Sequence, residues 1–351
     1  MSKFHIKGKK IGILSDIHLG LGQDSKQWHD VALDFANWAA DTFIDKGIND
    51  IVIPGDVFHN RTEINVNTIA VAKIFFDHFK DFRIFISSGN HDSFYKDKST
   101  INSISILDGW NNIHVIDQHP ITIKTDYEDI VLVPWGTKFE DIPETKGIIF
   151  GHFEISSFYM NSYKVCEHGI ESKDLLTKAP YIISGHFHKR DHRKYKNGNI
   201  LYVGSCFQHN FGDAGDDRGI YVFDLSDNSF EFIENNISPK HYKISVKELK
   251  KNKEKYNDVI EKNIVSIVVD EKIDQDELLS LTTSVFKDKK PLAYRTDYVN
   301  EDEIKLNDED KNIDSGNILK DIEEFVENLD VEYKKEIIEY LTETYKLLTN
   351  E

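Results

Sequence analysis

Five short polar motifs in the sequence carry residue types that bind metal ions. Their carboxylates, imidazoles and one amide stand in Asp16-x-His18, Gly55-Asp56-x-x-His59-Asn60, Gly89-Asn90-His91-Asp92, Gly151-His152 and Gly185-His186-x-His188. Mixed oxygen and nitrogen ligands suit manganese or iron, and zinc is a further candidate. Because one carboxylate can bridge two ions about 3.5–4 Å apart, the motifs together predict a binuclear metal site.

The third motif also holds groups suited to acid–base chemistry. Asn90 offers a carbonyl oxygen to a hard cation, His91 can transfer a proton near neutral pH, and Asp92 can hold an imidazole in one tautomer. An isolated Gly-Asn-His-Asp can equally be an ordinary turn, and an isolated His-x-His can be a surface or core pair. The ordered set of five motifs, each in a similar context, favours the metal site.

That context is an apolar, strand-like run directly before each motif. These runs cover residues 10–15, 51–53, 82–86, 147–150 and 181–184. Residues i and i+2 of an extended segment point the same way, so Asp16 and His18 can face one cation, as can His186 and His188. Amphipathic helical patterns near 28–43 and 66–79 alternate with the first strands. The pattern predicts an α/β fold with the site at the carboxyl ends of the strands.

The remaining chain divides by composition. We expect strands at 113–116, 121–124 and 130–133, and closing strands of a second sheet at 199–203 and 219–225, which completes a first domain over residues 1–238. We expect residues 239–299 to form a small α+β domain. Its strands are expected at 242–246, 264–269 and 292–298, and its helix at 274–286. Residues 300–316 form a charged linker, and residues 317–351 a C-terminal helical pattern.

Composition limits the class of protein. The formal net charge of −18 argues against a simple DNA-coating protein, and hydrophobic residues at 39% are sufficient for a sizeable core. The two cysteines, Cys166 and Cys206, lack a metal-type spacing and are expected to be reduced, buried thiols, which fits the cytoplasm. No run of 18 apolar residues occurs, so no membrane span is expected.

Several other features have a structural interpretation. The remaining histidines are expected to face solvent or pack locally; they include His5, His29, His78, His114, His119, His192, His209 and His241. The basic run at residues 189–194 is a candidate phosphate contact, with a solvated loop as the alternative.

With these motifs in place, the chain resembles the calcineurin-like metallophosphoesterase superfamily, and within it the SbcD-type nucleases of DNA double-strand-break repair, in particular their tailed-phage version. Two further stretches carry the closer likeness, residues 151–169 and residues 204–219. The resemblance implies a two-sheet α/β/β/α sandwich over residues 1–238, a capping domain over 239–299 and C-terminal helices.

The resemblance also implies roles for the motif residues. Asp16, His18 and His188 bind one metal ion, Asn90, His152 and His186 bind the other, and Asp56 bridges them. His91 is the proton donor or transition-state stabiliser, oriented by Asp92, and His59 positions the scissile phosphate. The implied activity is a manganese-dependent 3'-5' exonuclease and single-strand endonuclease, in which two metal ions activate a hydroxide. Its setting is DNA repair, recombination and replication.

Partners follow from the same resemblance. The chain has no Gly-x-x-x-x-Gly-Lys-Ser/Thr motif, so an SbcC-type ABC coiled-coil ATPase would supply ATP hydrolysis and bind the C-terminal helix at 317–351. A homodimer through the early helices is also implied. Two alternatives stay open: a small-substrate phosphatase or cyclic-nucleotide phosphodiesterase, which would turn over nucleotides and cleave DNA poorly, and a non-catalytic metal-bearing scaffold, which would not need His91 and Asp92.

Overall fold

The computed structural model describes residues 4–160, 164–287 and 289–299, together with residues 326, 333–335 and 337–340. The chain divides into two compact units, Met1–Asp297 and Tyr298–Glu351. The predicted linker at 300–316 lies outside the described residues, as does most of the predicted C-terminal helix. Within that helix, residues 334–335 and 337–340 are helical.

A six-stranded sheet carries the first three motifs. Its order is β13-β12-β2-β3-β4-β5. The bounds are β2 Lys10–Ile13, β3 Asp50–Pro54, β4 Arg83–Ser87, β5 Ile113–Ile116, β12 Gly219–Asp224 and β13 Ser229–Glu234. Strands β2 to β5 are parallel, so the ends of β2, β3 and β4 deliver their motifs to one edge.

Strand β12 corrects one expectation. Residues 219–225 were expected to close the second sheet, but β12 pairs antiparallel with β2 in the first sheet. Its side chains alternate between two cores, with Ile220 and Val222 beneath the helices and Tyr221 and Phe223 between the sheets. Both faces of β12 are therefore buried, and its hydrophobic run is compatible with either sheet.

A seven-stranded sheet carries the other two motifs. Its order is β1-β6-β7-β8-β9-β11-β10. The bounds are β1 His5–Ile6, β6 Ile121–Thr125, β7 Ile130–Leu132, β8 Ile148–Gly151, β9 Tyr181–Ser184, β10 Asp191–Tyr195 and β11 Gly198–Tyr202. Strands β8 and β9 are parallel neighbours, so the segments carrying His152 and His186 follow adjacent strand ends.

Most of the basic run at residues 189–194 lies in an edge strand, β10, and not in the solvated loop that was the alternative to a phosphate contact. Strand β10 pairs antiparallel with β11. Arg193 donates to Asp191 and to the Ser157 carbonyl, and the Arg190 guanidinium lies 3.7 Å from the centre of the Phe232 ring. These cationic side chains are therefore engaged within the protein.

The two sheets pack face to face between helical layers. Helices α2 (Lys26–Asp45) and α3 (Val66–Asp77) cover the outer face of the six-stranded sheet, where Ile51 and Ile53 point, whereas Val52 points into the core between the sheets. On the far side, helix α4 (Ser172–Lys178) contributes Leu175 to a third core. This arrangement confirms the predicted α/β/β/α sandwich.

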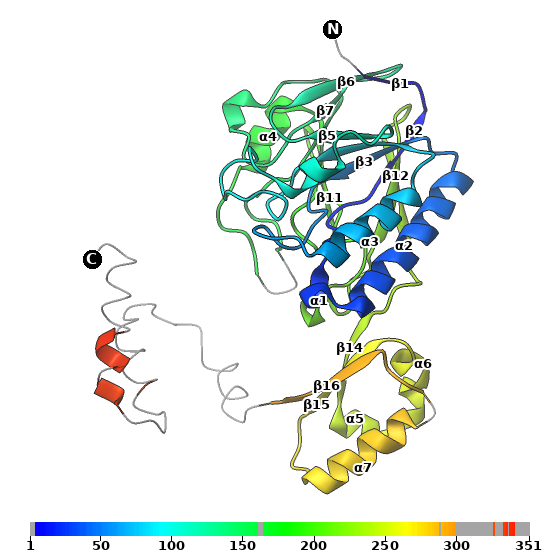
Figure 1. Cartoon of the computed structure of the whole chain (residues 1–351), viewed down its shortest axis with the longest axis vertical. Helices are drawn as coiled ribbons and strands as arrows, with labels where there is room; N and C mark the ends of the chain where they lie inside the picture. The colour runs from blue at the N-terminus through cyan, green and yellow to red at the C-terminus, as the bar shows by residue number, and fades with distance from the viewer. Residues whose placement is uncertain are drawn as a thin grey trace. The chain divides into compact units, whose positions relative to one another are not determined.

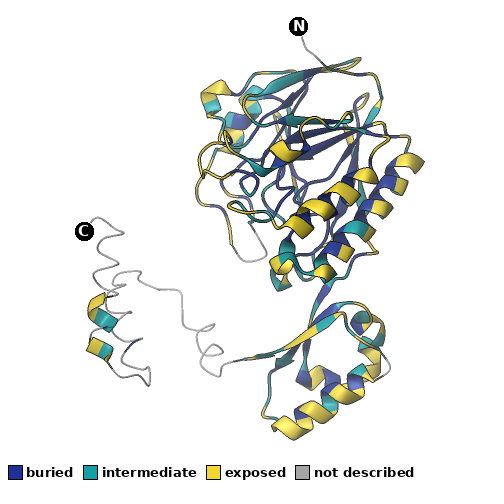
Figure 2. Cartoon of the chain, in the orientation of Figure 1, coloured by how far each residue is buried: buried dark blue, intermediate teal, exposed yellow. Residues whose placement is uncertain are grey.

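The local sequence accounts for the two long helices. Ser25 caps α2 by accepting from the Trp28 backbone N–H, and Asn65 caps α3 in the same way. The helices lie side by side, with buried residues toward the sheet and exposed residues outward (Figures 1 and 2). A short helix, α1 (Leu21–Asp24), precedes α2.

Residues after 240 form a separate small sheet with its own core. Strands β14 (His241–Ser245), β15 (Ile264–Val269) and β16 (Ala293–Tyr298) stand in that order, and α7 (Gln275–Phe286) adds Leu278 and Val285 to the core. The sequence analysis did not include helices α5 (Val246–Lys251) and α6 (Asn257–Ile260). The predicted domain boundaries, 238/239 and 299/300, remain predictions.

Among the described residues, no helix combines the length and apolarity that crossing a bilayer requires. The two cysteines are free and buried, as expected.

Candidate metal centre

All seven predicted metal ligands gather at the edge where the two sheets meet. Asp16, His18, Asp56, Asn90 and His152 are buried, and His186 and His188 are partly exposed. Among the described residues, groups with ligand atoms within 4.8 Å of one another include Asp16–His18–Asp56 and Asp56–His152–His186. Asp56 belongs to both groups.

The backbone is strained at four of these ligands. The φ angles of Asp16, His18 and Asp56 are 53°, 53° and 54°, and that of His186 is 92°. Non-glycine residues rarely adopt a positive φ, because this conformation is unfavourable for them. Such residues persist where the surrounding structure holds them in place, and they cluster at functional sites. Here the strained turns direct the ligand side chains back toward one point at the strand ends.

Two glycines permit this close approach. Gly55 has a φ of 101°, and a Cβ there would meet the His152 ring. A Cβ on Gly89 would meet the Asp56 carboxylate. Any larger residue at either position would therefore push a ligand away from the centre.

The Asp56 carboxylate lies between two sets of histidines. Its Oδ1 accepts the His91 backbone N–H at 2.8 Å. Its Oδ2 lies 3.3 Å from Nε2 of His152 and 3.5 Å from Nε2 of His18. One oxygen is thus held by the backbone while the other faces both histidine sets, as a bridging ligand requires.

The first set of ligands surrounds His18. Its Nε2 lies 3.1 Å from Nε2 of His188, and its Nδ1 lies 3.2 Å from Nδ1 of His59. Burial holds the pKa of His18 well below its ordinary value and lowers that of His188 to about 4. Both rings are therefore neutral at pH 7, so each keeps a nitrogen lone pair for a cation.

The second set surrounds the Asn90 amide. Its Oδ1 lies 2.8 Å from Nε2 of His152 and 2.9 Å from Nδ1 of His186. Nδ1 of His152 lies 2.8 Å from the Pro54 carbonyl, and Nε2 of His186 lies 3.4 Å from a Glu154 oxygen. The Pro54 carbonyl accepts the N–H of His152, and the Glu154 carboxylate lies near Nε2 of His186. The other nitrogen of each ring faces the amide oxygen, so both rings lie as metal-binding imidazoles do when an outer partner orients them.

The charge of this set favours a cation. Burial lowers the pKa of His152, but the charge of Asp56 outweighs that effect and raises the pKa to about 9. Asp56 thus favours positive charge at Nε2 of His152, where a bound cation would also place it. Because oxygen and nitrogen acceptors converge on both sides of Asp56, the residues present fit two divalent ions.

Asp92 does not orient His91, contrary to the prediction. The Asp92 carboxylate is fully buried and accepts four backbone N–H groups, those of Asp56, Val57, Phe58 and Gly89, at 2.8–3.0 Å. Burial and the charge of Asp56 raise the pKa of Asp92 to about 6, although these hydrogen bonds lower it. Its role in the fold is to fasten the Asp56 loop to the Gly89 loop.

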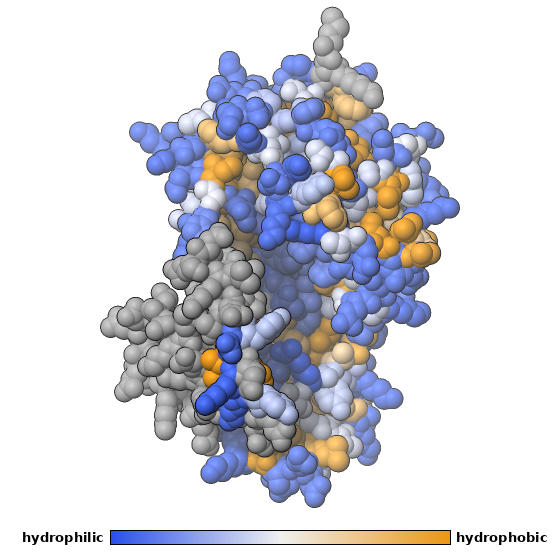
Figure 3. Space-filling view, turned by 60° about the vertical axis from the view of Figure 1, so that its left-hand side comes forward, coloured by the Kyte–Doolittle hydropathy of each residue, from blue (hydrophilic) through white to orange (hydrophobic). Residues whose placement is uncertain are grey.

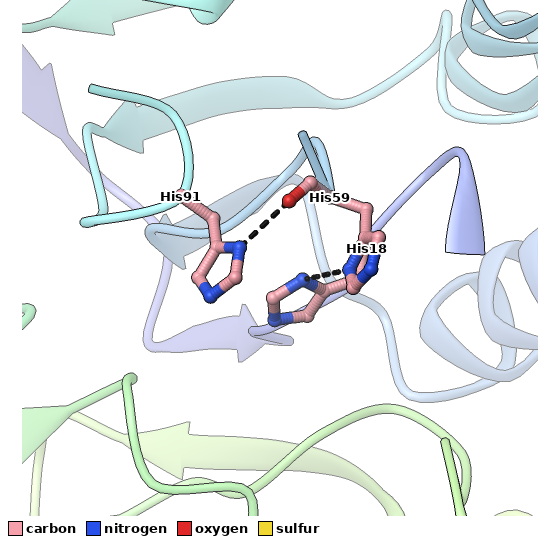
Figure 4. A group of neighbouring side chains, drawn as sticks. All are labelled: His18, His59 and His91. Carbon is pink, nitrogen blue, oxygen red and sulfur yellow. Dashed lines mark hydrogen bonds between the residues drawn. The ribbon is translucent and has the colours of Figure 1, made fainter. Parts of the chain in front are cut away.

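A backbone carbonyl orients His91 instead. Nδ1 of His91 lies 2.7 Å from the carbonyl oxygen of His59, and the two rings are stacked with centres 5.7 Å apart (Figure 4). Nδ1–H therefore donates to that carbonyl, which leaves Nε2 of His91 available to exchange a proton with a substrate. His59 and His91 both border His18.

Three residues that sequence analysis left without a role also adjoin the centre. Glu154 lies beside His186, as described above. Nη2 of Arg61 lies 3.0 Å from the side-chain amide of Asn90, so its guanidinium stands next to the ligands. His209, expected to face solvent or pack locally, is buried against His18 and His188. Glu154 and Arg61 each follow a motif histidine by two positions, whereas no spacing marks His209.

Comparison with known proteins agrees with this geometry. The family model of calcineurin-like phosphoesterases matches residues 9–190, and the chain belongs to this family. The predicted family is thereby confirmed.

Two of the similar proteins are viral. Exonuclease subunit 1 of Enterobacteria phage T4 is 30% identical over 295 residues, covering 76% of this chain and 85% of the relative. Putative phosphoesterase 078R of Invertebrate iridescent virus 3 is 26% identical over 223 residues, covering 59% of this chain and 60% of the relative. A solved archaeal phosphodiesterase covers 64% of this chain and 99% of its own, at 15% identity and a TM-score of 0.37.

Proposed function

We propose that the chain is a metal-dependent DNA nuclease, with 3'-5' exonuclease and single-strand endonuclease activity. The observation that carries the proposal is the single Asp56 oxygen between two histidine sets, which suits two ions clamping one phosphodiester. The likeness to a phage exonuclease subunit supports a DNA substrate. By the resemblance to SbcD-type nucleases, manganese is the proposed metal.

The protein residues divide the remaining work. Asp16, His18, His188 and Asp56 would hold one ion, and Asp56, Asn90, His152 and His186 the other. When bound, the two ions supply Lewis acidity and a water activated for attack on phosphorus. His91 donates a proton from Nε2, and His59 positions the phosphate.

Groups beside the ligands suit a nucleotide. The guanidinium of Arg61, which lies beside Asn90, can hold a non-bridging phosphate oxygen. A cavity of about 190 Å³ lined by Trp135, His152 and Glu154 opens next to the second ligand set. An aromatic side chain at such a position can stack on a nucleobase without reading its identity.

The net charge of −18 means that DNA must be bound through local groups. The surface in Figure 3 is mostly hydrophilic, with apolar side chains in small separate groups. Two bound divalent ions would offset part of the negative charge at the site.

We also propose a complex. The phage relative is named as a subunit, and the SbcD-type resemblance implies an SbcC-type ABC coiled-coil ATPase bound through residues 317–351. A homodimer through the early helices is supported by the exposed face of α3, on which Val66, Ile69 and Ile74 are 81%, 44% and 50% exposed. The proposed setting is DNA recombination, repair and replication in the host cytoplasm.

A substrate panel tests the activity. End-labelled duplex DNA, circular single-stranded DNA, nucleotides and p-nitrophenyl phosphate esters would be incubated with manganese and the purified chain, with Asp56→Asn as the control. Cleavage of both DNA forms, with mononucleotides released from 3' ends, is expected. Turnover of nucleotides or esters without DNA cleavage would instead identify a small-substrate enzyme, and no turnover by wild type would identify a scaffold.

A further inference from the structure

His209 is a buried histidine with no hydrogen-bond partner for its ring. Its relative exposure is 7%, and among the described residues neither Nδ1 nor Nε2 has a partner. A buried imidazole normally satisfies at least one ring nitrogen, because an unpaired polar group away from water is unfavourable. The ring therefore lacks an interaction that its position requires.

The neighbours of His209 are two of the proposed metal ligands. Its ring centre lies 4.6 Å from that of His188 and 5.0 Å from that of His18, nearly perpendicular to both. One ring nitrogen from each of the three histidines lies within 4.8 Å of the others. Three imidazoles arranged in this way present their nitrogens to a common point.

One ion pair fixes the backbone on both sides of this cluster. Asp213 accepts the His209 backbone N–H at 2.8 Å and pairs with Arg218 at 2.8 Å. Arg218 in turn donates to the His188 backbone carbonyl. Both members of the pair are buried, so His209 is held at a fixed position beside His188.

We propose that His209 is an additional ligand of the ion held by Asp16, His18, Asp56 and His188. The inference rests on the proposed two-metal centre. With His209 as a ligand, the two metal positions are unequal, because the first has three imidazoles and the second has two. Imidazole suits iron, cobalt and zinc better than manganese, so the first position should favour these metals relative to the second.

Cobalt provides the probe. The full chain would be stripped of metal, loaded with one equivalent of Co²⁺, and examined by X-ray absorption, which counts imidazole ligands, and by visible absorption. The same titration would be made on His209→Phe and His209→Leu. The control is His241→Phe, since His241 is a buried histidine that packs on Phe211 and belongs to none of the ligand groups.

The expected result is three imidazoles on the first Co²⁺ in wild type and in His241→Phe. Loss of an outer partner typically costs about 10–100-fold in metal affinity, so loss of a direct ligand should weaken that ion by at least about tenfold. Both His209 variants should also lose preference for Zn²⁺ over Mn²⁺ at one position only.

Two results would overturn the inference, and they differ in their meaning. If wild type binds two ions, with no more than two imidazoles at either position and affinities that neither His209 variant alters, His209 is not a ligand and the proposed function stands. If wild type binds no Co²⁺, the metal centre itself is refuted, and the inference with it. The wild-type imidazole count decides the question even if both variants fail to fold.

Discussion

The Nε2 atoms of His18 and His188 lie 3.1 Å apart although 170 positions separate the two residues in the chain. His18 follows β2 of the six-stranded sheet, and His188 follows β9 of the seven-stranded sheet. The centre therefore forms only when the sandwich has closed. A cation bound there links the two sheets, so metal binding and folding should be coupled.

We predict that His91→Ala lowers the rate of DNA cleavage by about 10²–10⁴-fold, the usual contribution of a general acid. DNA affinity and metal content should persist, because the Nδ1–H of His91 is held by the His59 carbonyl and the residue is not among the proposed ligands. Single-turnover cleavage and metal analysis of the same sample make the test. Loss of metal from the variant would mean that His91 is a ligand.

Asp92→Ala should act on stability more than on chemistry. The substitution leaves four buried N–H donors without an acceptor, and each orphaned donor costs about 1–3 kcal/mol. We expect the free energy of unfolding to fall by at least about 3 kcal/mol, measured by urea denaturation. Ser93→Ala, which loses one hydrogen bond to the Gly89 carbonyl, is the control. A stable Asp92→Ala protein with specifically reduced cleavage would restore the role of Asp92 in catalysis.

The individual strands could be predicted from local sequence signals, but the sheet to which β12 belongs could not. Apolar runs that end in glycine-rich ligand motifs mark β2, β3, β4, β8 and β9 individually. Strand β12 joins the six-stranded sheet by pairing with β2, about 200 positions earlier in the sequence. The periodicity of a local segment does not encode such a distant pairing.

The proposed ligands could likewise be predicted from motifs, whereas the roles of the surrounding residues Asp92 and His209 could not. Asp92 adjoins His91 in sequence, but the chain turns its carboxylate toward four backbone N–H groups. His209 carries no motif spacing, and the Asp213–Arg218 pair helps to hold it beside the centre. Residues that act through tertiary contacts leave no local pattern.

His241 should make stability sensitive to acid. Burial lowers its pKa from 6.5 to about 4, so the folded state favours the neutral ring. The contribution of the neutral His241 ring to the stability of the folded state is complete above pH 6.5, and it is lost progressively as the pH falls toward 4. We predict that the melting temperature of His241→Phe falls less than that of wild type between pH 7 and pH 4.5. Parallel melting curves at five pH values make the comparison, and equal losses would contradict it.

Deleting residues 317–351 should separate catalysis from complex formation. The amphipathic pattern, with Ile337, Ile338 and Leu341 on one face, favours an apolar groove on a partner coiled coil. We expect manganese-dependent cleavage of simple substrates to persist while co-purification with the ATPase is abolished. A pull-down with a thermal melt of the truncated chain is the test. Unfolding of the remaining chain, or full retention of the ATPase, would argue against docking through this segment.

The central claim is a pair of ions that share Asp56, and calorimetric titration of Mn²⁺ tests it most directly. Metal-stripped wild type should bind two ions per chain. Asp56→Asn removes the charge that faces both histidine sets, so it should weaken both ions together and abolish cleavage. Two ions bound by Asp56→Asn with wild-type affinity, or a single ion bound by wild type, would contradict the two-metal account.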